Sequence, residues 1–399
     1  EKFWQPIKPV ISNLKIRGSW GLVGNDATNA GRFAYMEDLV LGGSDSYTTG
    51  IRQDTYYSGP SWNRYFNPDL TWEVGEKINL GLDLQLFNDF NLTFDIFREK
   101  RRDIFMTREN SIPEIVGTGE TKITSNNGEM ENKGLDLAID YNKQITKDFF
   151  LSFKSTLTFA RNKVLKMDES PYFEYPGLSD VGHPLGTYWG YVVDGLFPDQ
   201  ETIDNSPRQD LGCTPQPGDI KYVNQPNAKG EYDNVINSND RVAIGHPYDP
   251  ELVYGFGPSM KWKNWDFSFF FQGVARTSFM MYGMHPFGTT SIKNMLQFVA
   301  DDHWSVDNPN PNAAYPRLTK DSNGNNDQYS TYWLRNAAFL KLKNAEIGYT
   351  YKGMRFYLSG VNLLTFSPFK HWDPEMGGGN GLYYPTQRVF NIGFQMTIQ

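Results

Sequence analysis

The last stretch of the chain, residues 389–399, alternates without interruption between two kinds of side chain. Apolar residues fill the even positions from Phe390 to Ile398, and polar or small residues fill the odd ones from Asn391 to Gln399. A β-strand directs successive side chains to opposite faces, so the pattern predicts a strand with one wholly apolar face. Its length of about eleven residues is roughly twice that of a usual globular strand and suits a tilted strand that crosses a bilayer.

The same period of two recurs along the chain and predicts an all-β, antiparallel protein of ten strands. In the strand near the C-terminus that includes Asn344 the phase slips, which predicts a β-bulge. The nine further alternating stretches are residues 14–22, 78–86, 92–96, 135–141, 151–159, 252–262, 265–271, 339–349 and 356–366.

The connections between these strands alternate between short and long. Short turns centre on Asn88, Lys147, Asn264 and Lys352. Transmembrane up-and-down β-barrels have this asymmetry, with short periplasmic turns and long outer loops. An even number of strands then brings the C-terminus to the periplasmic side. The predicted long loops are about 23–71, 106–131, 166–250, 282–336 and 367–387.

Two other β architectures compete with this prediction. A soluble β-sandwich alternates equally well, but its strands are shorter and its loops need not be long at every second connection. Alternatively, the ten strands close on themselves and form a passive pore or an adhesin. Aromatic residues flank the short turns, as Trp262 and Trp265 do, which favours a girdle at one membrane interface.

Composition narrows the classes of function. Aromatic residues make up 15% of the chain while the mean hydropathy is −0.55, and no run of 18 apolar residues occurs, which predicts no transmembrane helix. The balance of 38 basic and 46 acidic residues contains no basic block, which argues against nucleic acid as a partner. Cys213 is the single cysteine, so the sequence offers neither a disulfide framework nor a cysteine-based zinc site.

Signals for catalysis or bound metal are weak. The five histidines are scattered, and no nucleophile elbow, metalloprotease or phosphate-loop motif occurs, so we expect no catalytic residue. An enzyme on a soluble β fold would need a convergent acid and base pair. An oxygen-rich segment offers weak calcium ligands, with a polar turn as the alternative. Its residues are Asp233, Asn237, Asn239 and Asp240.

Several segments resemble, in the right order, the C-terminal half of the SusC/RagA-like TonB-dependent outer-membrane transporters of Bacteroidetes. The resemblance covers nearly the whole chain and is specific as a set. The segments are 14–21 (LKIRGSWG), 24–26 (GND), 72–73 (WE), 79–83 (NLGLD), 127–134 (NGEMENKG), 186–191 (GTYWGY), 194–195 (DG), 217–220 (PGDI), 239–241 (NDR), 244–245 (IG), 270–273 (FFQG), 315–318 (YPRL) and 359–363 (SGVNL).

This resemblance implies a function and partners. In that family the barrel is of the plugged 22-strand class, so the ten strands would be its C-terminal portion. The plug, the other strands and the segment that contacts TonB would lie N-terminal to residue 1, which is Glu rather than Met. The family imports nutrients across the Gram-negative outer membrane with a SusD-like surface lipoprotein and needs no cofactor. We expect an oligosaccharide substrate, with short peptides as the alternative.

The resemblance also bears on individual residues. Relatives often carry an Asn-Gly-Asp-Gly run where this chain has residues 224–230, which disfavours calcium. Aromatic side chains in the long loops are suited to stacking on sugars, and nearby carboxylates and amides to binding hydroxyl groups. Alternatively, these aromatics pack the loops together or seat the lipoprotein. The candidate ligand-binding residues are Trp189, Tyr191, Trp304, Tyr332, Trp333, Trp372, Tyr383 and Tyr384.

Overall fold

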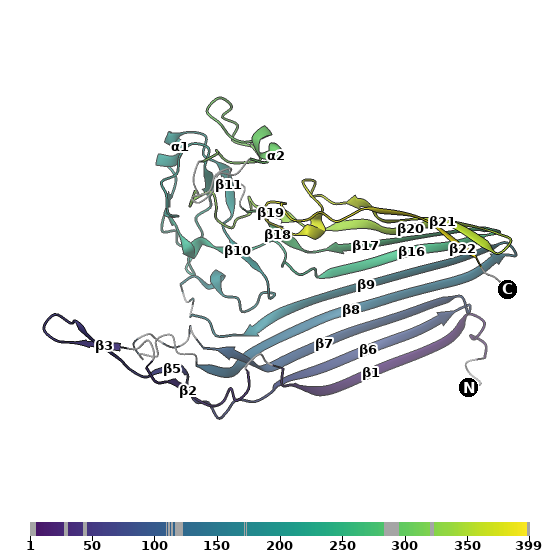
Figure 1. The fold of residues 1–399 in the computed structure, drawn as a ribbon, viewed down its shortest axis with the longest axis horizontal. Helices are drawn as coiled ribbons and strands as arrows, with labels where there is room; N and C mark the ends of the chain where they lie inside the picture. Colours follow the sequence, from purple (N-terminus) through teal and green to yellow (C-terminus); the bar gives the residue numbers. More distant parts are fainter. Residues whose placement is uncertain are drawn as a thin grey trace.

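One antiparallel sheet of ten long strands forms the body of the computed structural model (Figure 1). Each strand is hydrogen-bonded to the next long strand along the chain, which confirms the predicted up-and-down order. The model describes residues 5–27, 31–42, 46–108, 110, 112, 115, 123–170, 172, 174–282, 295–319 and 323–396. The ten strands are β1 (Ile11–Asn25), β6 (Glu73–Leu86), β7 (Phe90–Thr107), β8 (Thr124–Thr146), β9 (Phe149–Lys166), β16 (Leu252–Trp262), β17 (Trp265–Ala275), β20 (Phe339–Tyr351), β21 (Met354–Phe366) and β22 (Val389–Met396).

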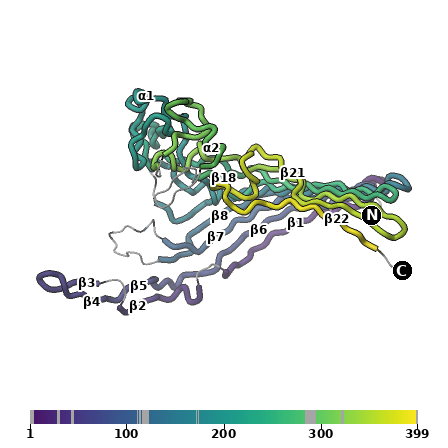
Figure 2. The backbone as a smooth tube through the Cα atoms, turned by 45° about the horizontal axis from the view of Figure 1, so that its top comes forward, coloured from purple at the N-terminus to yellow at the C-terminus, as the bar shows by residue number. Residues whose placement is uncertain are grey.

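The sheet is open at both ends. In the described part of the chain, β1 pairs with β6 and β22 pairs with β21, and the two outer strands do not pair with each other. The curvature of the sheet is visible in Figure 2. Unpaired backbone groups cost several kcal/mol each in lipid. This arrangement therefore differs from a self-closed ten-strand barrel, and each edge needs a further strand.

The apolar face of the sheet is exposed rather than packed against a second layer. Ile16 and Leu80 lie on this face and are 72% and 51% exposed, and Ile392 of β22 is 89% exposed. A β-sandwich would bury these side chains against a facing sheet. An exposed apolar face that covers a whole sheet is instead typical of a barrel wall in contact with lipid hydrocarbon.

The opposite face of the sheet carries ion pairs. The Arg17 guanidinium of β1 donates to both carboxylate oxygens of Asp83 in β6 at 2.9 Å, and to Asp95 in β7 at 2.9 and 3.1 Å. Arg355 of β21 similarly pairs with Asp266 of β17. Charged, cross-linked side chains on this face are consistent with a polar lumen.

Several strands are longer than predicted, and the largest difference is in one pair. Strands β7 and β8 extend to Thr107 and from Thr124, so residues 106–107 and 124–131 of the predicted loop at 106–131 lie in strands instead. The alternation ended early because charged residues replace apolar ones in this part of both strands. The bulge predicted near Asn344 is confirmed by a register shift between Leu342 and Asn344. Residues 397–399 of the predicted last strand lie outside the described residues.

The long connections contain short elements of their own. None of the helices in the described residues is long and apolar enough to span a membrane. The short strands are β2 (Asp38–Val40), β3 (Ser46–Thr49), β4 (Thr55–Ser58), β5 (Ser61–Arg64), β10 (Tyr188–Gly190), β11 (Val193–Leu196), β12 (Arg208–Gln209), β13 (Ile220–Tyr222), β14 (Val235–Ile236), β15 (Val242–Ile244), β18 (Ser278–Met280) and β19 (Leu334–Asn336). The helices are α1 (Gln200–Asp204), α2 (Gln297–Asp301) and the 3-10 turns Pro176–Leu178, Ser238–Asp240 and Pro374–Met376.

The buried core of the protein lies in these connections. The described parts of residues 176–250, 276–338 and 367–387 pack together, and we call them the loop assembly. Its core includes Ile220, Tyr222, Phe279 and Val299, all at most 2% exposed. The assembly sits at the end of the strands opposite the two chain termini (Figure 1).

Candidate ligand-binding site

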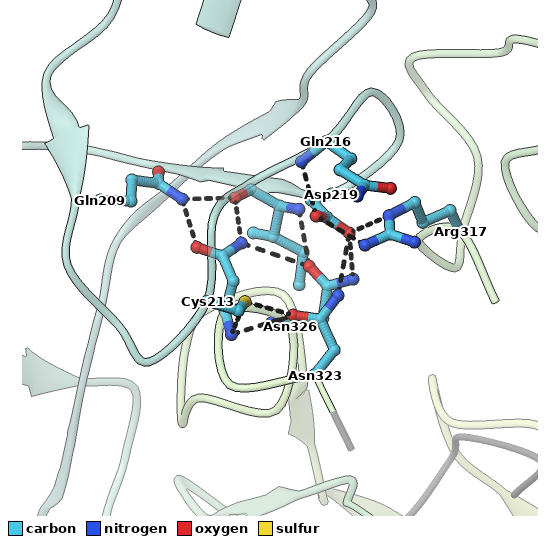
Figure 3. Close-up of polar contacts among 9 residues, drawn as sticks. Gln209, Cys213, Gln216, Asp219, Arg317, Asn323 and Asn326 are labelled. Carbon is cyan, nitrogen blue, oxygen red and sulfur yellow. Dashed lines mark hydrogen bonds and ion pairs between the residues drawn. The ribbon is translucent and has the colours of Figure 1, made fainter. Parts of the chain in front are cut away.

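A buried carboxylate joins two long connections of the loop assembly (Figure 3). Asp219, which is fully buried, accepts hydrogen bonds from Arg317 at 2.6 and 3.1 Å. It also accepts from the side-chain amides of Asn323 at 3.0 Å and Asn326 at 2.8 Å, and from the backbone N–H of Gln216 at 2.8 Å. A buried charge is costly unless it is paired and hydrogen-bonded, and here five donors satisfy both oxygens.

The side-chain amides of Asn325 and Gln209 extend this network. Asn325 is fully buried and donates to the backbone carbonyl of Ile220 at 2.8 Å. Gln209 donates to the same carbonyl at 3.0 Å, and its own carbonyl accepts from the backbone of Tyr222 at 2.7 Å. The network therefore fixes residues 323–326 against β13, although the two segments are about a hundred residues apart in sequence.

A cavity of about 310 Å³ lies beside this network. Its wall combines aromatic rings with amide, carboxylate and guanidinium groups, which together can contact apolar surface and form hydrogen bonds with a ligand. The network residues Arg317, Asn323 and Asn326 hold one side in place. The other described lining residues are Met281, Tyr282, Val299, Tyr315, Pro316, Leu318, Thr319, Asp327, Gln328, Tyr329 and Trp333.

Four of the eight predicted ligand-binding aromatics serve as packing groups in the loop assembly. Tyr191 is 3% exposed and lies 5.1 Å from the ring of Tyr222. The indole N–H of Trp189 donates to Asp180 at 2.6 Å, and that of Trp372 donates to the Gly377 carbonyl at 2.9 Å. Trp304 is 6% exposed. These four side chains are held by protein groups on most sides, although their contact with a ligand stays a prediction.

Two other predicted aromatics, Tyr332 and Trp333, lie close to the cavity. Trp333 lines it and donates its indole N–H to the Asn326 carbonyl at 2.6 Å. Tyr332 packs on Trp333 with ring centres 5.2 Å apart and donates to the Ala313 carbonyl at 2.9 Å. Burial raises the pKa of the Tyr332 hydroxyl well above its usual range, so it is a hydrogen-bond donor at neutral pH.

The last two, Tyr383 and Tyr384, are exposed. They line a second hollow of about 490 Å³, at the start of β22. A hydrogen bond between Tyr383 and Tyr282 also links Tyr383 to the rim of the first cavity, and it raises the pKa of Tyr282. Of the eight predicted aromatics, Trp333 therefore lines the first cavity, Tyr332 packs behind it, and Tyr383 contacts its rim through Tyr282.

A buried lysine ties the last long connection to the sheet. Lys341 of β20 is fully buried, and its ammonium group pairs with Asp373 at 2.5 Å and with Glu375. Burial raises the pKa values of both carboxyls, but hydrogen bonds, chiefly from Lys341, outweigh burial and lower both pKa values overall. The sequence pattern did not reveal this anchor because Lys341 lies at a polar position of an ordinary alternating strand.

The oxygen-rich segment proposed for calcium forms a local turn. Both oxygens of Asp240 accept backbone N–H groups, from Gln225 at 2.7 Å and from Asn237 at 2.8 Å. Asn237 accepts from the Asn239 backbone at 2.8 Å, and Asp233 from that of Val235 at 3.0 Å. Among the residues that the structure describes, no group of three or more His, Cys, Asp or Glu side chains is placed to hold a metal ion.

Comparison with known proteins identifies the family. The model of the TonB dependent receptor-like β-barrel family matches residues 12–363. The chain belongs to this family. It is 28% identical to the TonB-dependent receptor P26 of Formosa agariphila, over 97% of this chain and 40% of that protein. It is also 28% identical to the TonB-dependent receptor SusC of Bacteroides thetaiotaomicron, over 97% of this chain and 38% of SusC.

Solved structures share the fold of this receptor barrel. The structure of the RagAB peptide transporter aligns over 97% of this chain and 41% of that chain, with a TM-score of 0.70 and 22% identity. The RagAB peptide importer in the open-open state aligns over 98% of this chain and 40% of that chain, with a TM-score of 0.72 and 20% identity. This chain spans about two fifths of the curated relatives. Family membership and the exposed apolar face place this barrel portion in the outer membrane.

Two motifs that carried the resemblance to this receptor family meet in the loop assembly. Asp219 belongs to the 217–220 motif and Arg317 to the 315–318 motif, and their ion pair joins them. Gly218 has a φ of +88°, and a Cβ there would lie 2.2 Å from Cε3 of Trp304, so this motif position requires glycine. Both motifs are visible in the sequence, but no local pattern indicates that they pair, because 98 residues separate Asp219 from Arg317.

Proposed function

We propose that this chain is the C-terminal barrel portion of a TonB-dependent importer. Family membership and the ten-strand sheet support the proposal. The free edges of β1 and β22 support it as well, because strands from an N-terminal part of the same transporter would pair with both. That part would also supply the plug and the segment that contacts TonB. The protein would then act in transport rather than catalysis.

The orientation of the barrel follows from the lengths of its connections. Short periplasmic turns and long outer loops are the rule for such barrels, so the loop assembly faces the outside. A SusD-like surface lipoprotein would dock on it. Exposed aromatic residues such as Tyr384 and Tyr248, which are 81% and 58% exposed, support this role because aromatics are enriched at protein interfaces.

The substrate that we propose is an oligosaccharide. The cavity carries this proposal, because it presents rings of Tyr282, Tyr329 and Trp333 together with the side chains of Asn326 and Gln328. Sugars have apolar faces that stack on aromatic rings and hydroxyl groups that pair with amides. We expect no cofactor, and we propose that no metal takes part in binding.

A short peptide is the second candidate substrate. Arg317 and Asp327 also line the cavity, and a guanidinium and a carboxylate would pair with the two termini of a peptide. The two candidates make opposite demands on the site, since sugar binding depends on the aromatic faces and peptide binding on the charges.

Titrating the purified transporter with oligosaccharides and with short peptides tests the proposal. Tyr329 is 48% exposed and lines the cavity, so Tyr329→Ala removes a stacking face without opening the buried core. We expect oligosaccharide affinity to fall about fivefold, since an aromatic contact contributes about 1 kcal/mol. Tyr232→Ala is the matched control, because Tyr232 is similarly exposed and does not line the cavity.

Each outcome discriminates between the candidates. Oligosaccharide binding that weakens in Tyr329→Ala and is unchanged in Tyr232→Ala supports the cavity as a sugar site. Binding of peptides alone replaces the first candidate with the second. If ligand binds equally well to both variants and to the wild type, the cavity is not the binding site.

A further inference from the structure

The outward face of strands β7, β8 and β9 changes from apolar to basic at one level. The strand register aligns Leu80, Ile96, Leu135, Phe159 and Leu252 in a continuous apolar row. One step toward the long connections, the same face carries Arg98, Lys133 and Arg161 side by side. The next step carries Lys100, Glu131 and Lys163.

We call the cations of this face the basic belt. Arg276 belongs to it, because its guanidinium carbon lies 5.7 Å from the centre of the Phe159 ring. Four carboxylates lie on this face, namely Glu76, Glu129, Glu131 and Glu251, against seven cations in a chain whose net charge is −8. The basic belt consists of Arg98, Lys100, Arg102, Lys133, Arg161, Lys163 and Arg276.

The placement of like charges points to an anionic partner. Arg98 is the direct register partner of Lys133, and Lys133 is that of Arg161. Like charges directly opposite on neighbouring strands are destabilising. All three side chains are more than half exposed, at 52%, 59% and 53%, so their charged ends are accessible from the membrane surface.

The carboxylates on this face leave part of the positive charge unbalanced. Glu131 is shared by Arg98 at 2.6 Å and Lys133 at 2.7 Å. Glu251 is similarly shared by Arg161 at 3.1 Å and Arg276 at 2.7 Å. Each of these buried carboxylates therefore serves two cations. In the described part of the chain, neither Arg102 nor Lys163 has a carboxylate within 4.0 Å.

We propose that the basic belt binds the phosphate-bearing headgroups of lipids in the leaflet on the side of the long connections. Phosphates lie directly above the hydrocarbon, which is where the basic belt lies relative to the apolar row. Several cations on adjacent strands, spaced about 4.8 Å apart, provide a surface for such groups. In the orientation proposed above this is the outer leaflet, while the binding itself does not depend on the orientation or on the substrate.

Native mass spectrometry of the full transporter in neutral detergent tests the proposal. The probes are dioleoyl phosphatidic acid, which carries a phosphate monoester, and dioleoyl phosphatidylcholine, which has the same acyl chains. We expect the wild type to retain phosphatidic acid preferentially. The double variant Arg102→Gln and Lys163→Gln should retain about thirtyfold less, since each of the two cations near an anionic surface contributes about 1 kcal/mol.

Matched controls separate the belt from general charge effects. The double variant Lys261→Gln and Lys263→Gln removes the same charge beside the short turn between β16 and β17, and it should bind like the wild type. Excess inorganic phosphate should leave bound lipid in place if the acyl chains are part of the ligand. Equal retention by all three proteins, or an equal loss in both variants, would overturn the proposal. Oligosaccharide affinity should be unchanged in the belt variant, so the two proposals fail independently.

Discussion

Replacing Leu82 with arginine tests whether the apolar face contacts hydrocarbon. Leu82 is the central apolar residue of the stretch 78–86 in β6 and is in register with Ile16 and Phe94, both apolar. Four residues separate it from either end of the stretch, which is about 14 Å along the strand and about 10 Å of depth at the usual tilt. An arginine side chain at this depth is too short to place its guanidinium outside the hydrocarbon.

The expected cost of Leu82→Arg is about 2 to 4 kcal/mol of unfolding free energy, the range for arginine at the middle of a bilayer. Tryptophan fluorescence during guanidinium unfolding in phosphatidylcholine vesicles measures it. The control is Gln85→Arg, at a polar position of the same strand, and it should cost less than about 1 kcal/mol because its side chain faces the lumen. Asp83 is unsuitable as a control, since it binds Arg17 at 2.9 Å. Equal tolerance of arginine at both positions would refute the assignment of faces.

Two further predictions concern the loop assembly. Asp219→Asn should destabilise it by about 3 kcal/mol, because Arg317, whose side chain is only 23% exposed, would lose its charged partner, and hydrogen exchange should report faster opening of residues 315–319. Lys341→Met should release the last long connection, and low pH should do the same. Folding lowers the pKa values of Asp373 and Glu375 below their ordinary values of 3.8 and 4.5. The stability that these carboxylates contribute is therefore complete above the ordinary values and is lost as the pH falls through the lowered pKa values. Limited proteolysis by pepsin can measure this loss.

Exposed groups provide the controls for these two predictions. Asp210→Asn changes a carboxylate that is 64% exposed and should leave hydrogen exchange unchanged. Lys147→Met, in the short turn between β8 and β9, should leave residues 367–387 as protected as in the wild type. A loop assembly that is indifferent to Asp219→Asn would contradict a structural role for the network. If residues 367–387 stay protected from pepsin in Lys341→Met, the aromatic contacts of this connection are sufficient to hold it on the sheet.

The strands were predictable because hydrocarbon imposes one simple rule on them. From Ile78 to Leu86 every outward residue is Ile or Leu, so the period of two is visible without any knowledge of neighbours. The rule fails where the strand leaves the hydrocarbon. Arg98 and Lys133 continue β7 and β8 on the same face, but their charges end the apolar pattern, and the strands therefore looked shorter than they are.

The candidate site was less predictable because its residues meet through tertiary packing. Trp304 and Trp333 lie in polar stretches of sequence, and only the folded assembly shows that they are 6% and 7% exposed. The contact between Asp219 and Arg317 spans 98 residues, and no local pattern records it. Motif positions could be recognised one by one, whereas the cavity depends on how the connection at 276–338 folds back on itself and packs against Asp219.

The division between the wall and the loops explains where the chain needs particular residues. In the wall, backbone hydrogen bonds hold the sheet and lipid solvates its outward face, so any large apolar side chain suits a position such as Leu82. The loop assembly lies outside the hydrocarbon and must bury its own core, as soluble domains do. Gly218 is fixed there by the ring of Trp304, and Asp219 by five donors, so substitutions in the assembly should be less tolerated than apolar exchanges in the wall.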